Sequence, residues 1–187
     1  MRAPQPVVLS GHGVRLEPLT VAHAPDLLAA AADDDVWRWL PVSRPRTLDD
    51  VRRFVLEHSG TPAFAVVVDG RARGSTSYLD VDLSVGGLEI GWTWYARELW
   101  ATTVNPACKL LLLAHAFDEL GAERVTLKTD GRNSRSQGAI RRLGAVYDGT
   151  LRHHRLRADG TVRDTAFFSI LRAEWPGVRA GLQARLT

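Results

Sequence analysis

Apolar positions recur along the chain with two periods, one typical of strands and the other of helices. Residues 14–19 alternate as in an edge strand that Pro18 bounds. Helical spacing follows, first after Thr20 and again after Thr47, both of which suit the cap of a helix. The apolar positions of these helices are Ala24, Leu27, Leu28 and Ala31 in the first, and Val51, Phe54 and Val55 in the second. The pattern therefore predicts one strand followed by two helices.

The strand period returns in the middle of the chain. Runs at 63–68 and 74–81 are joined by Asp69-Gly70, a dipeptide typical of a hairpin turn. A third run covers 88–95. Its alternation predicts two faces, one with Leu88, Ile90, Trp92 and Trp94, and the other with Glu89, Gly91, Thr93 and Tyr95.

A long helix is predicted over 106–120, where the residues are apolar nearly all round. Asn105 and Pro106 have the order of a cap followed by proline at the first helical position, and Gly121 ends the helix. Such a helix should be largely buried. Cys108, the one cysteine of the chain, is therefore expected to be a small core residue rather than a reactive thiol.

The segment 124–145 carries the clearest functional signal. A β-type run, 124–130, leads through a short polar turn to Asn133, whose side chain is suited to cap a helix. Ser136 shares a helical face with Ile140 and Leu143, which directs it toward the sheet. A polar pair at a strand–helix junction is a common way for an α/β protein to hold a ligand. The same pattern also suits an ordinary capped amphipathic helix.

Two more strands, 146–155 and 162–171, flank the turn Asp159-Gly160, and a last helix covers 174–186. The order is β-α-α-β-β-β-α-β-α-β-β with a terminal helix. It predicts an α/β (α+β) fold in one domain, residues 1–187 with a core over 14–172. The sheet should have about seven strands, be mixed but mostly antiparallel, and carry helices on both faces. An exposed apolar face on the last helix would favour a homodimer.

Composition narrows the class of protein. The chain has 187 residues, of which 45% are hydrophobic and 24% charged, as in an average soluble domain. Apolar runs fall short of the ~18 residues of a membrane span, and the start of the chain does not resemble a signal peptide, so we expect a cytoplasmic protein without a membrane partner. Its net charge of +3 is too small and scattered to predict a nucleic-acid partner. Its histidines lack a metal-binding spacing, so no metal is expected.

The order of these segments, with the residues they carry, resembles the GCN5-related N-acetyltransferase (GNAT) superfamily, and within it the ribosomal-protein-alanine N-acetyltransferases. The resemblance covers roughly residues 14–176. It rests on the stretches GVRLEPL, LEIGWTWY, LWATTVNPACKLLLLAHAF, ERVTLKTDGRNSRSQGAIRRLGA and LRHHRLRADGTVRDTAFFSIL with EWP. Each stretch is weakly specific, whereas their order and spacing together are specific.

The resemblance implies that an acetyl group passes from acetyl-coenzyme A (acetyl-CoA) to an amine, either a protein N-terminus or a small molecule. It implies that strand 88–95 splays from its parallel neighbour and that the pantetheine arm bonds to its backbone. The diphosphate would lie at the start of the long helix, where free N–H groups favour an anion. The coenzyme-binding residues implied are Thr93, Trp94, Trp100, Thr102, Thr103, Val104, Asn105, Asn133 and Ser136.

Two side chains are candidates for the chemistry. Glu89 would take the proton of the amine, directly or through a water. It would otherwise be a surface glutamate or the partner of a neighbouring arginine. Ser136 would donate to the departing thiolate, as the resemblance implies, or would merely complete the helix cap. Tyr95 is a weaker candidate donor, and a backbone N–H of residues 93–95 would meet the oxyanion.

The acceptor site is less clear from the sequence. Trp37 and Trp39 follow three aspartates in the segment that covers the acceptor in the family, and would form its aromatic wall. Core packing is the alternative for both tryptophans. A basic run, residues 152–157, alternates its side chains between two faces and so does not predict a single cluster.

One departure from the family pattern raises a second hypothesis. Ala101 and Thr103 stand where the family usually has glycines that let the backbone approach a phosphate. The hydroxyls of Thr102 and Thr103 are able to donate to phosphate oxygens and would compensate. If they do not, the chain would be a non-catalytic acyl-CoA-binding or protein-interaction member of the same fold.

Overall fold

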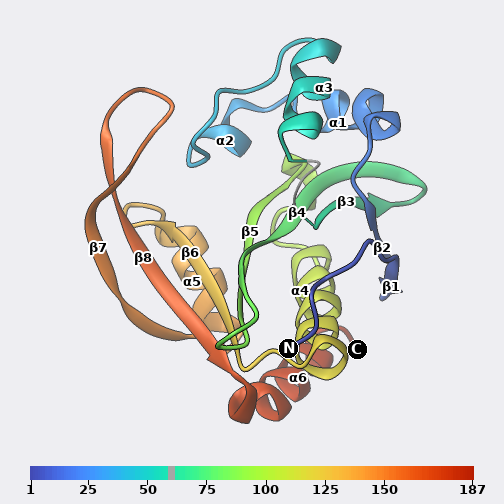
Figure 1. Ribbon diagram of the computed structural model, residues 1–187. Helices are drawn as coiled ribbons and strands as arrows, with labels where there is room; N and C mark the ends of the chain where they lie inside the picture. The colour runs from blue at the N-terminus through green and yellow to red at the C-terminus, as the bar shows by residue number, and fades with distance from the viewer. Residues whose placement is uncertain (59–61) are drawn as a thin grey trace.

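The computed structural model describes residues 1–58 and 62–187. Within them one eight-stranded sheet has the order β1-β2-β3-β4-β5-β6-β8-β7 (Figure 1). Neighbouring strands are antiparallel except β5 and β6. The strands are β1 (Leu9–Gly11), β2 (Val14–Pro18), β3 (Ala63–Val68), β4 (Arg71–Asp82), β5 (Gly87–Tyr95), β6 (Arg124–Asp130), β7 (Val146–Leu156) and β8 (Val162–Leu171). The predicted mixed, mostly antiparallel sheet is confirmed, with β1 as an additional strand too short to show alternation.

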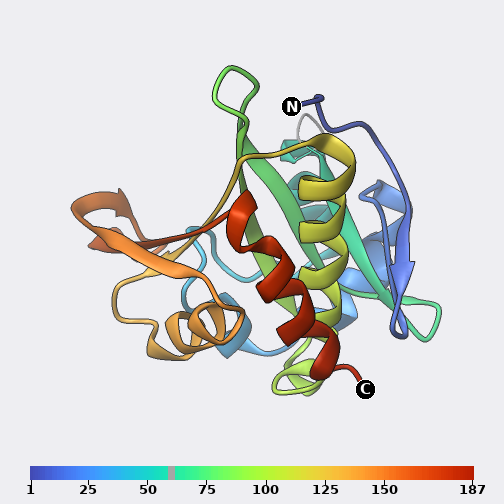
Figure 2. The same ribbon diagram turned by 90° about the horizontal axis from the view of Figure 1, so that it is seen from below.

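Helices cover both faces of the sheet, as predicted (Figures 1 and 2). One face carries α1 (Ala24–Ala30), α2 (Asp34–Trp37) and α3 (Leu48–Glu57). The other carries α4 (Val104–Ala114), which continues through a π-helical segment (His115–Leu120), together with α5 (Ser134–Arg142) and α6 (Trp175–Ala184). None of the helices in the described residues has the length and apolar character needed to cross a bilayer.

Each face has its own core. On the α4 face the largest buried side chains include Tyr78, Phe117 and Phe168. The Tyr78 hydroxyl donates to the backbone carbonyl of Leu112 at 2.7 Å, so this buried phenol is hydrogen-bonded. On the α1–α3 face a smaller core is built around Trp37 and its neighbours from α3 and β5. The two cores fix the sheet between two layers of helices.

β5 contains a bulge at Trp92. Opposite it on β4, Ser77 pairs with Gly91 and Ser75 pairs with Trp94, so β5 has one residue more than β4 between these pairs. The φ of Trp92 is +49°, in the left-handed region. The bulge interrupts the regular ladder and reverses the alternation of side chains along the strand.

The two faces predicted for 88–95 are therefore wrong beyond the bulge. Tyr95 joins Leu88 and Ile90 in the core under α4, whereas Trp94 lies in the core of the other face. Trp92 packs against that second core as well. Apolar residues occupy both faces of the strand here, so the sequence pattern contains no sign of the reversal.

The caps predicted from sequence are confirmed for α3 and α5. Thr47 Oγ1 accepts from the N–H of Asp50 at 3.1 Å, and Asn133 Oδ1 accepts from the N–H of Ser136 at 3.0 Å. These bonds satisfy donors that have no partner within the helix. The Asn133 cap fixes how the chain leaves β6 and enters α5.

α4 begins earlier than predicted, at Val104 rather than at Pro106. Asn105 therefore lies inside the first turn and does not cap the helix; its Oδ1 accepts from the Tyr95 hydroxyl at 3.2 Å. Proline is still tolerated, because N–H groups of the first turn have no intrahelical acceptor. Gly121, with φ of +77°, ends the helical segment as predicted.

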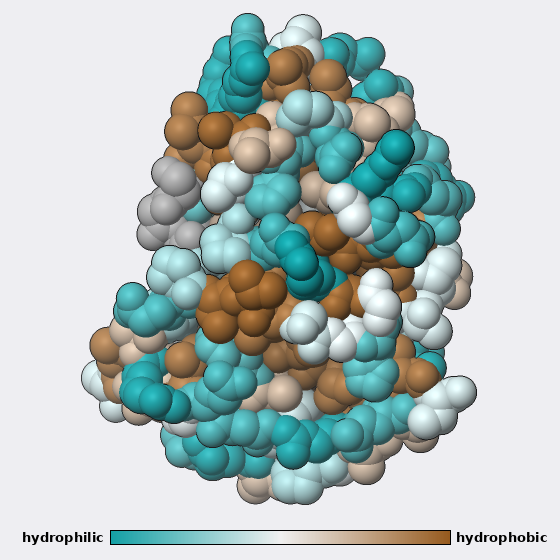
Figure 3. Space-filling model, turned by 90° about the vertical axis from the view of Figure 1, so that its right-hand side faces the viewer, coloured by the Kyte–Doolittle hydropathy of each residue, from teal (hydrophilic) through white to brown (hydrophobic). Residues whose placement is uncertain are grey.

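α6 does not present an exposed apolar face. Trp175, Val178 and Leu182 are buried in the core on the α4 face, and Figure 2 shows α6 beside α4. The argument for a homodimer that rested on this face is therefore wrong. Apolar surface occurs elsewhere: the side of the molecule in Figure 3 shows brown patches broken by polar side chains, and Val8, before β1, is exposed.

Candidate functional site

The parallel strands β5 and β6 part soon after they meet. Their backbone pairing runs only from Gly87 with Arg124 to Glu89 with Thr126, and the strands then diverge (Figure 1). Beyond Glu89, the backbone N–H and C=O groups of β5 that point toward β6 are not paired with that strand. Backbone N–H and C=O groups need partners, so the splay is a natural place for a ligand that supplies them.

Glu89 lies at the branch point of the splay and is only 2% exposed. The Nζ of Lys128, on β6, lies 2.5 Å from its Oε2, and the same Nζ lies 3.4 Å from Oδ2 of Asp80. Burial raises the pKa of Glu89, and the ammonium of Lys128 opposes that rise. A buried carboxylate with a raised pKa is a suitable proton acceptor near neutral pH. An added Cβ on Gly91 would collide with Glu89 Oε1, so glycine leaves the room that this carboxylate occupies.

Lys109 is a second buried cation beside the splay, one that sequence reasoning missed. It extends from α4, is 5% exposed, and its Nζ donates to Thr93 Oγ1 at 3.1 Å. Thr93 follows the bulge and also bonds to Thr76, with 2.8 Å between the two hydroxyl oxygens. Burial lowers the pKa of Lys109 to about 8. The one available signal was a lysine in an otherwise apolar helix.

The loop before α4 keeps the backbone of a glycine although the residue is alanine. Ala101 has φ of +60°, a left-handed conformation that strains a residue with a Cβ. Thr102 Oγ1 donates to the carbonyl of Leu99 at 2.7 Å and accepts from the N–H of Val104 at 3.3 Å. Thr103 has an ordinary helical φ of −72°. The Thr102 hydroxyl thus links the loop to the first residue of α4 through two hydrogen bonds.

Trp100 connects this loop to α5. Its Nε1 donates to the carbonyl of Tyr95 at 3.2 Å. The guanidinium carbon of Arg135, in the first turn of α5, lies 3.2 Å from the centre of the Trp100 ring, and that of Arg97 lies 4.3 Å from it. Burial lowers the pKa of Arg135, and the charge of Arg97 acts in the same direction. Two cations on one indole form a cation–π contact across the helix ends that flank the splay.

The first turn of α5 holds the polar pair predicted from sequence. Asn133 is buried and occupied as the cap, whereas Ser136 is half-buried. The Ser136 side chain is therefore more exposed to solvent than a side chain that points entirely into the core. Ile140, one turn further, is the buried residue of this helix.

The two tryptophans of the α2 region differ in their surroundings. Trp37 is 4% exposed, its ring lies 4.9 Å from that of Trp94, and its Nε1 donates to the carbonyl of Ala31 at 3.2 Å. Trp39 is half-buried, with the guanidinium of Arg132 5.6 Å from its ring centre. Trp37 is thus primarily a core residue, and Trp39 is the one nearer the surface.

The acetyltransferase (GNAT) domain family matches residues 14–146, which is most of the chain. This chain belongs to the GNAT family. The "Putative ribosomal N-acetyltransferase YdaF" of Bacillus subtilis (strain 168) is 29% identical over 134 residues, 72% of each protein. A "putative acetyltransferase from T. thermophilus" is 39% identical, with a TM-score of 0.91 over 99% of this chain and 100% of that one. Mycobacterium smegmatis RimJ, in complex with CoA-disulfide, shares the fold with a TM-score of 0.82 at 18% identity, over 98% of this chain and 97% of that one.

The resemblance drawn from sequence is therefore confirmed at the level of the family, and the chain is an acyltransferase of the GNAT type. The predicted coenzyme-binding residues fall on β5, on the loop before α4 together with its first turn, and on the cap and first turn of α5. The contact of Arg135 with Trp100 brings the last two together. Trp94 does not follow this grouping, because its side chain lies on the α1–α3 face.

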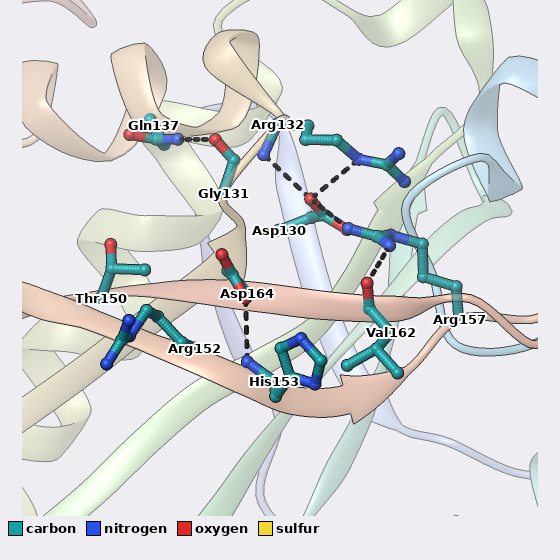
Figure 4. A pocket seen from close by; sticks show the side chains of 10 residues that line it. All are labelled: Asp130, Gly131, Arg132, Gln137, Thr150, Arg152, His153, Arg157, Val162 and Asp164. Carbon is teal, nitrogen blue, oxygen red and sulfur yellow. Dashed lines mark hydrogen bonds and ion pairs between the residues drawn. The ribbon is translucent and has the colours of Figure 1, made fainter.

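The end of β6 in this GNAT protein is fastened to the β7–β8 hairpin around Asp130 (Figure 4). Arg157, from the hairpin, donates through Nε to Asp130 Oδ2 at 2.7 Å and through Nη2 to Oδ1 at 3.3 Å. Arg132 Nε lies 3.7 Å from the same carboxylate. These residues line a cleft of about 970 Å³ between α5 and the hairpin. These ion pairs connect the β7–β8 hairpin to the end of β6, which is one of the two strands that form the splay.

In the described ranges, 1–58 and 62–187, no group of three or more histidine, cysteine, aspartate or glutamate side chains could hold a metal ion.

Proposed function

We propose that this GNAT protein transfers an acetyl group from acetyl-CoA to a primary amine by direct attack in a ternary complex. The observation that carries the proposal is the position of Glu89. It is the last β5 residue paired with β6, and its carboxylate is buried where the strands part. A thioester bound between the strands on the α4 side and an amine on the α1–α3 side would meet at this point.

Acetyl-CoA, as co-substrate, would be held by the residues that flank the splay. The backbone at Thr93 and Trp94 would bond to the pantetheine arm. The loop with Trp100, Thr102 and Thr103, and the first two residues of α4, Val104 and Asn105, would receive the diphosphate. Asn133 and Ser136 would contact the coenzyme from α5. The left-handed φ of Ala101 supports this, because the loop retains the conformation that a glycine would adopt.

In the reaction, Glu89 would take the proton of the attacking amine, and Lys128 would keep the carboxylate in place. The neutral nitrogen then attacks the thioester carbon. A backbone N–H of the bulge would stabilise the oxyanion. The carbon–sulfur bond breaks, the thiolate takes a proton from the Ser136 hydroxyl, and the surplus proton on the former amine nitrogen passes to the serine oxygen, which leaves a neutral amide, a thiol and an unchanged serine. Tyr95 is less suited to this role because its hydroxyl already donates to Asn105.

A protein N-terminus is the first acceptor to test, because the relative from B. subtilis is named a ribosomal N-acetyltransferase. Small-molecule amines are the second class. Trp39 would line the entrance for either one. Trp37 supports it from the core, since its ring and its Nε1 are occupied by protein partners.

The test is release of coenzyme A from acetyl-CoA in the presence of peptides and small amines. We expect Glu89→Gln to lower kcat by about 100-fold or more and to remove the rise of activity with pH through the pKa of the carboxyl group. Glu57→Gln, an exposed site on α3, is the matched control and should keep full activity. Calorimetric titration with acetyl-CoA runs in parallel. Tight binding without turnover of any amine, in both proteins alike, would favour the non-catalytic alternative.

A further inference from the structure

Arg163, on β8, is a buried cation without a carboxylate partner. It is 7% exposed, and its Nε donates to the Thr165 hydroxyl at 3.0 Å. Among the described residues no carboxylate oxygen lies within 4.0 Å of its guanidinium. A guanidinium has five N–H donors, and a buried charge left without a counter-ion is costly. The side chain is therefore in a position that a bound anion would stabilise.

Strand register places Arg163 on the face of the sheet that carries the Lys128–Glu89 pair. Lys128 is opposite Phe167, and Asp130 is opposite Thr165. Side chains two residues apart on a strand share a face, so Arg163 continues the row that Phe167 and Thr165 begin. Burial lowers the pKa of Arg163, and the carboxylates of Asp130 and, more weakly, Glu89 oppose that change.

Asp130, which lies opposite Thr165 on the neighbouring strand, is already bonded to another arginine. The Asp130 charge opposes the fall in the pKa of Arg163 that burial causes, but both of its carboxylate oxygens accept from Arg157. A second polar group lacks a partner on the same hairpin: His154 Nδ1 is buried without a hydrogen-bond partner within the described part of the chain. The imidazole lies 5.4 Å from the ring of Phe167. Burial lowers the pKa of His154, and the positive charges of Arg155, Lys128 and Arg163 act in the same direction.

A neighbouring cavity is rich in arginine. A cavity of about 590 Å³ opens between the α2 loop and the tip of the β7–β8 hairpin, and it reaches Arg157. The arginines that line it are Arg38, Arg44, Arg46, Arg132 and Arg157, against the acidic residues Asp34 and Asp159. Asp34 is itself paired with Arg44, at 3.2 Å. Such an excess of one charge in a cleft concentrates ligands of the opposite charge.

We propose that the acceptor of this transferase carries an oxyanion, a carboxylate or a phosphate, close to its reacting amine, and that Arg163 is the counter-ion of that group. The inference rests on the proposed function and specifies its substrate class. An amine placed at Glu89 would leave an anionic neighbouring group on the Arg163 side. A peptide with an acidic second residue, or an amino acid, has this chemistry.

Matched acceptors test the proposal. Peptides that begin Ala-Asp and Ala-phosphoserine are compared with Ala-Asn and Ala-Ser peptides of otherwise equal sequence, with kcat/KM measured by coenzyme A release. We expect wild type to prefer the anionic members by about 10- to 100-fold, the range for a hydrogen bond to a charged group. The two anionic arms tell a carboxylate from a phosphate.

Arg163→Gln should abolish this preference and keep turnover of the neutral peptides, while Arg163→Lys should keep part of it. Arg71→Gln removes an equal charge from an exposed position at the β3–β4 turn and should leave the preference unchanged. Equal rates for both members of each pair in wild type, or a preference that survives in Arg163→Gln, would overturn the proposal.

A second measurement keeps binding separate from catalysis. Calorimetric titration of the N-acetylated Asp and Asn peptides, the products, reads recognition of the anion without turnover. Tighter binding of the acidic product by wild type but not by Arg163→Gln, together with no transfer to any amine, would refute the proposed function and retain the anion site. Equal binding of both products would refute the anion site alone.

Discussion

Lys109→Met should make this protein more stable, and the gain should disappear as pH rises. Burial lowers the pKa of Lys109 from 10.5 to about 8, and each pKa unit corresponds to about 1.4 kcal/mol. Holding the protonated side chain in the fold therefore costs about 3 kcal/mol at neutral pH. Between pH 8 and 10.5 the unfolded chain binds this proton and the folded chain releases it, so the stability of wild type rises with pH in that window. Methionine has a similar length and removes the charge.

Urea unfolding at three pH values measures the effect. The free energy of unfolding of Lys109→Met should exceed that of wild type by about 3 kcal/mol at pH 7, about 2 at pH 9 and about 1 at pH 10. The corresponding rise in Tm at pH 7 is roughly 6–12 °C for a chain of this size. Leu111→Met, on the same helix, is the control and should change stability by less than about 1.5 kcal/mol at every pH. A variant that is no more stable at pH 7, or whose gain is equal at pH 10, would show that Lys109 is not a buried cation.

Three further features are each tested by substitution. Ala101→Gly should raise stability by about 0.5–1 kcal/mol, because its φ of +60° strains alanine, whereas Ala139→Gly inside α5 should lower it by about 1 kcal/mol; denaturant unfolding of both gives the contrast, and a loss at position 101 would contradict the strain. Gly91→Ala should lower kcat by about 10- to 100-fold with the fold retained by circular dichroism, because the new Cβ displaces the Glu89 carboxylate; unchanged kcat would show that the carboxylate need not lie there. Tyr78→Phe should cost about 1–2 kcal/mol by thermal unfolding, since the phenol is buried and donates at 2.7 Å; a stability equal to wild type would argue against that bond.

Features set by a few neighbouring residues could be predicted from sequence. The cap at Asn133 and the end of the helix at Gly121 follow from the chemistry of one side chain and one φ angle. The turn at Asp69-Gly70 is of the same kind, with positive φ at both residues. The order of the elements along the chain also predicted the two layers of helices and the parallel pair of strands. The place of Glu89 on a splayed strand came from the family resemblance, and β5 and β6 do part immediately after it.

Features that depend on distant partners could not be predicted. The bulge at Trp92 reverses the faces of β5. Because both faces carry apolar residues, the hydrophobic pattern of the sequence does not indicate this reversal. Lys109 differs from a surface lysine only because α4 is packed against Thr93. Arg163 has no carboxylate partner among the described residues, whereas Asp130, on the neighbouring strand, is bonded to Arg157. Each of these is a property of packing between elements rather than of local sequence.

The two lysines of the chain have a consequence for its surface chemistry. Among 24 basic residues only Lys109 and Lys128 have an ε-amino group, and both side chains are enclosed, with that of Lys128 13% exposed. The cationic outside of the molecule is made of guanidinium groups, which a thioester does not acylate under the same conditions. The side chains of this protein therefore offer few accessible amines to an acyl thioester, and the positive charge of its surface does not depend on them.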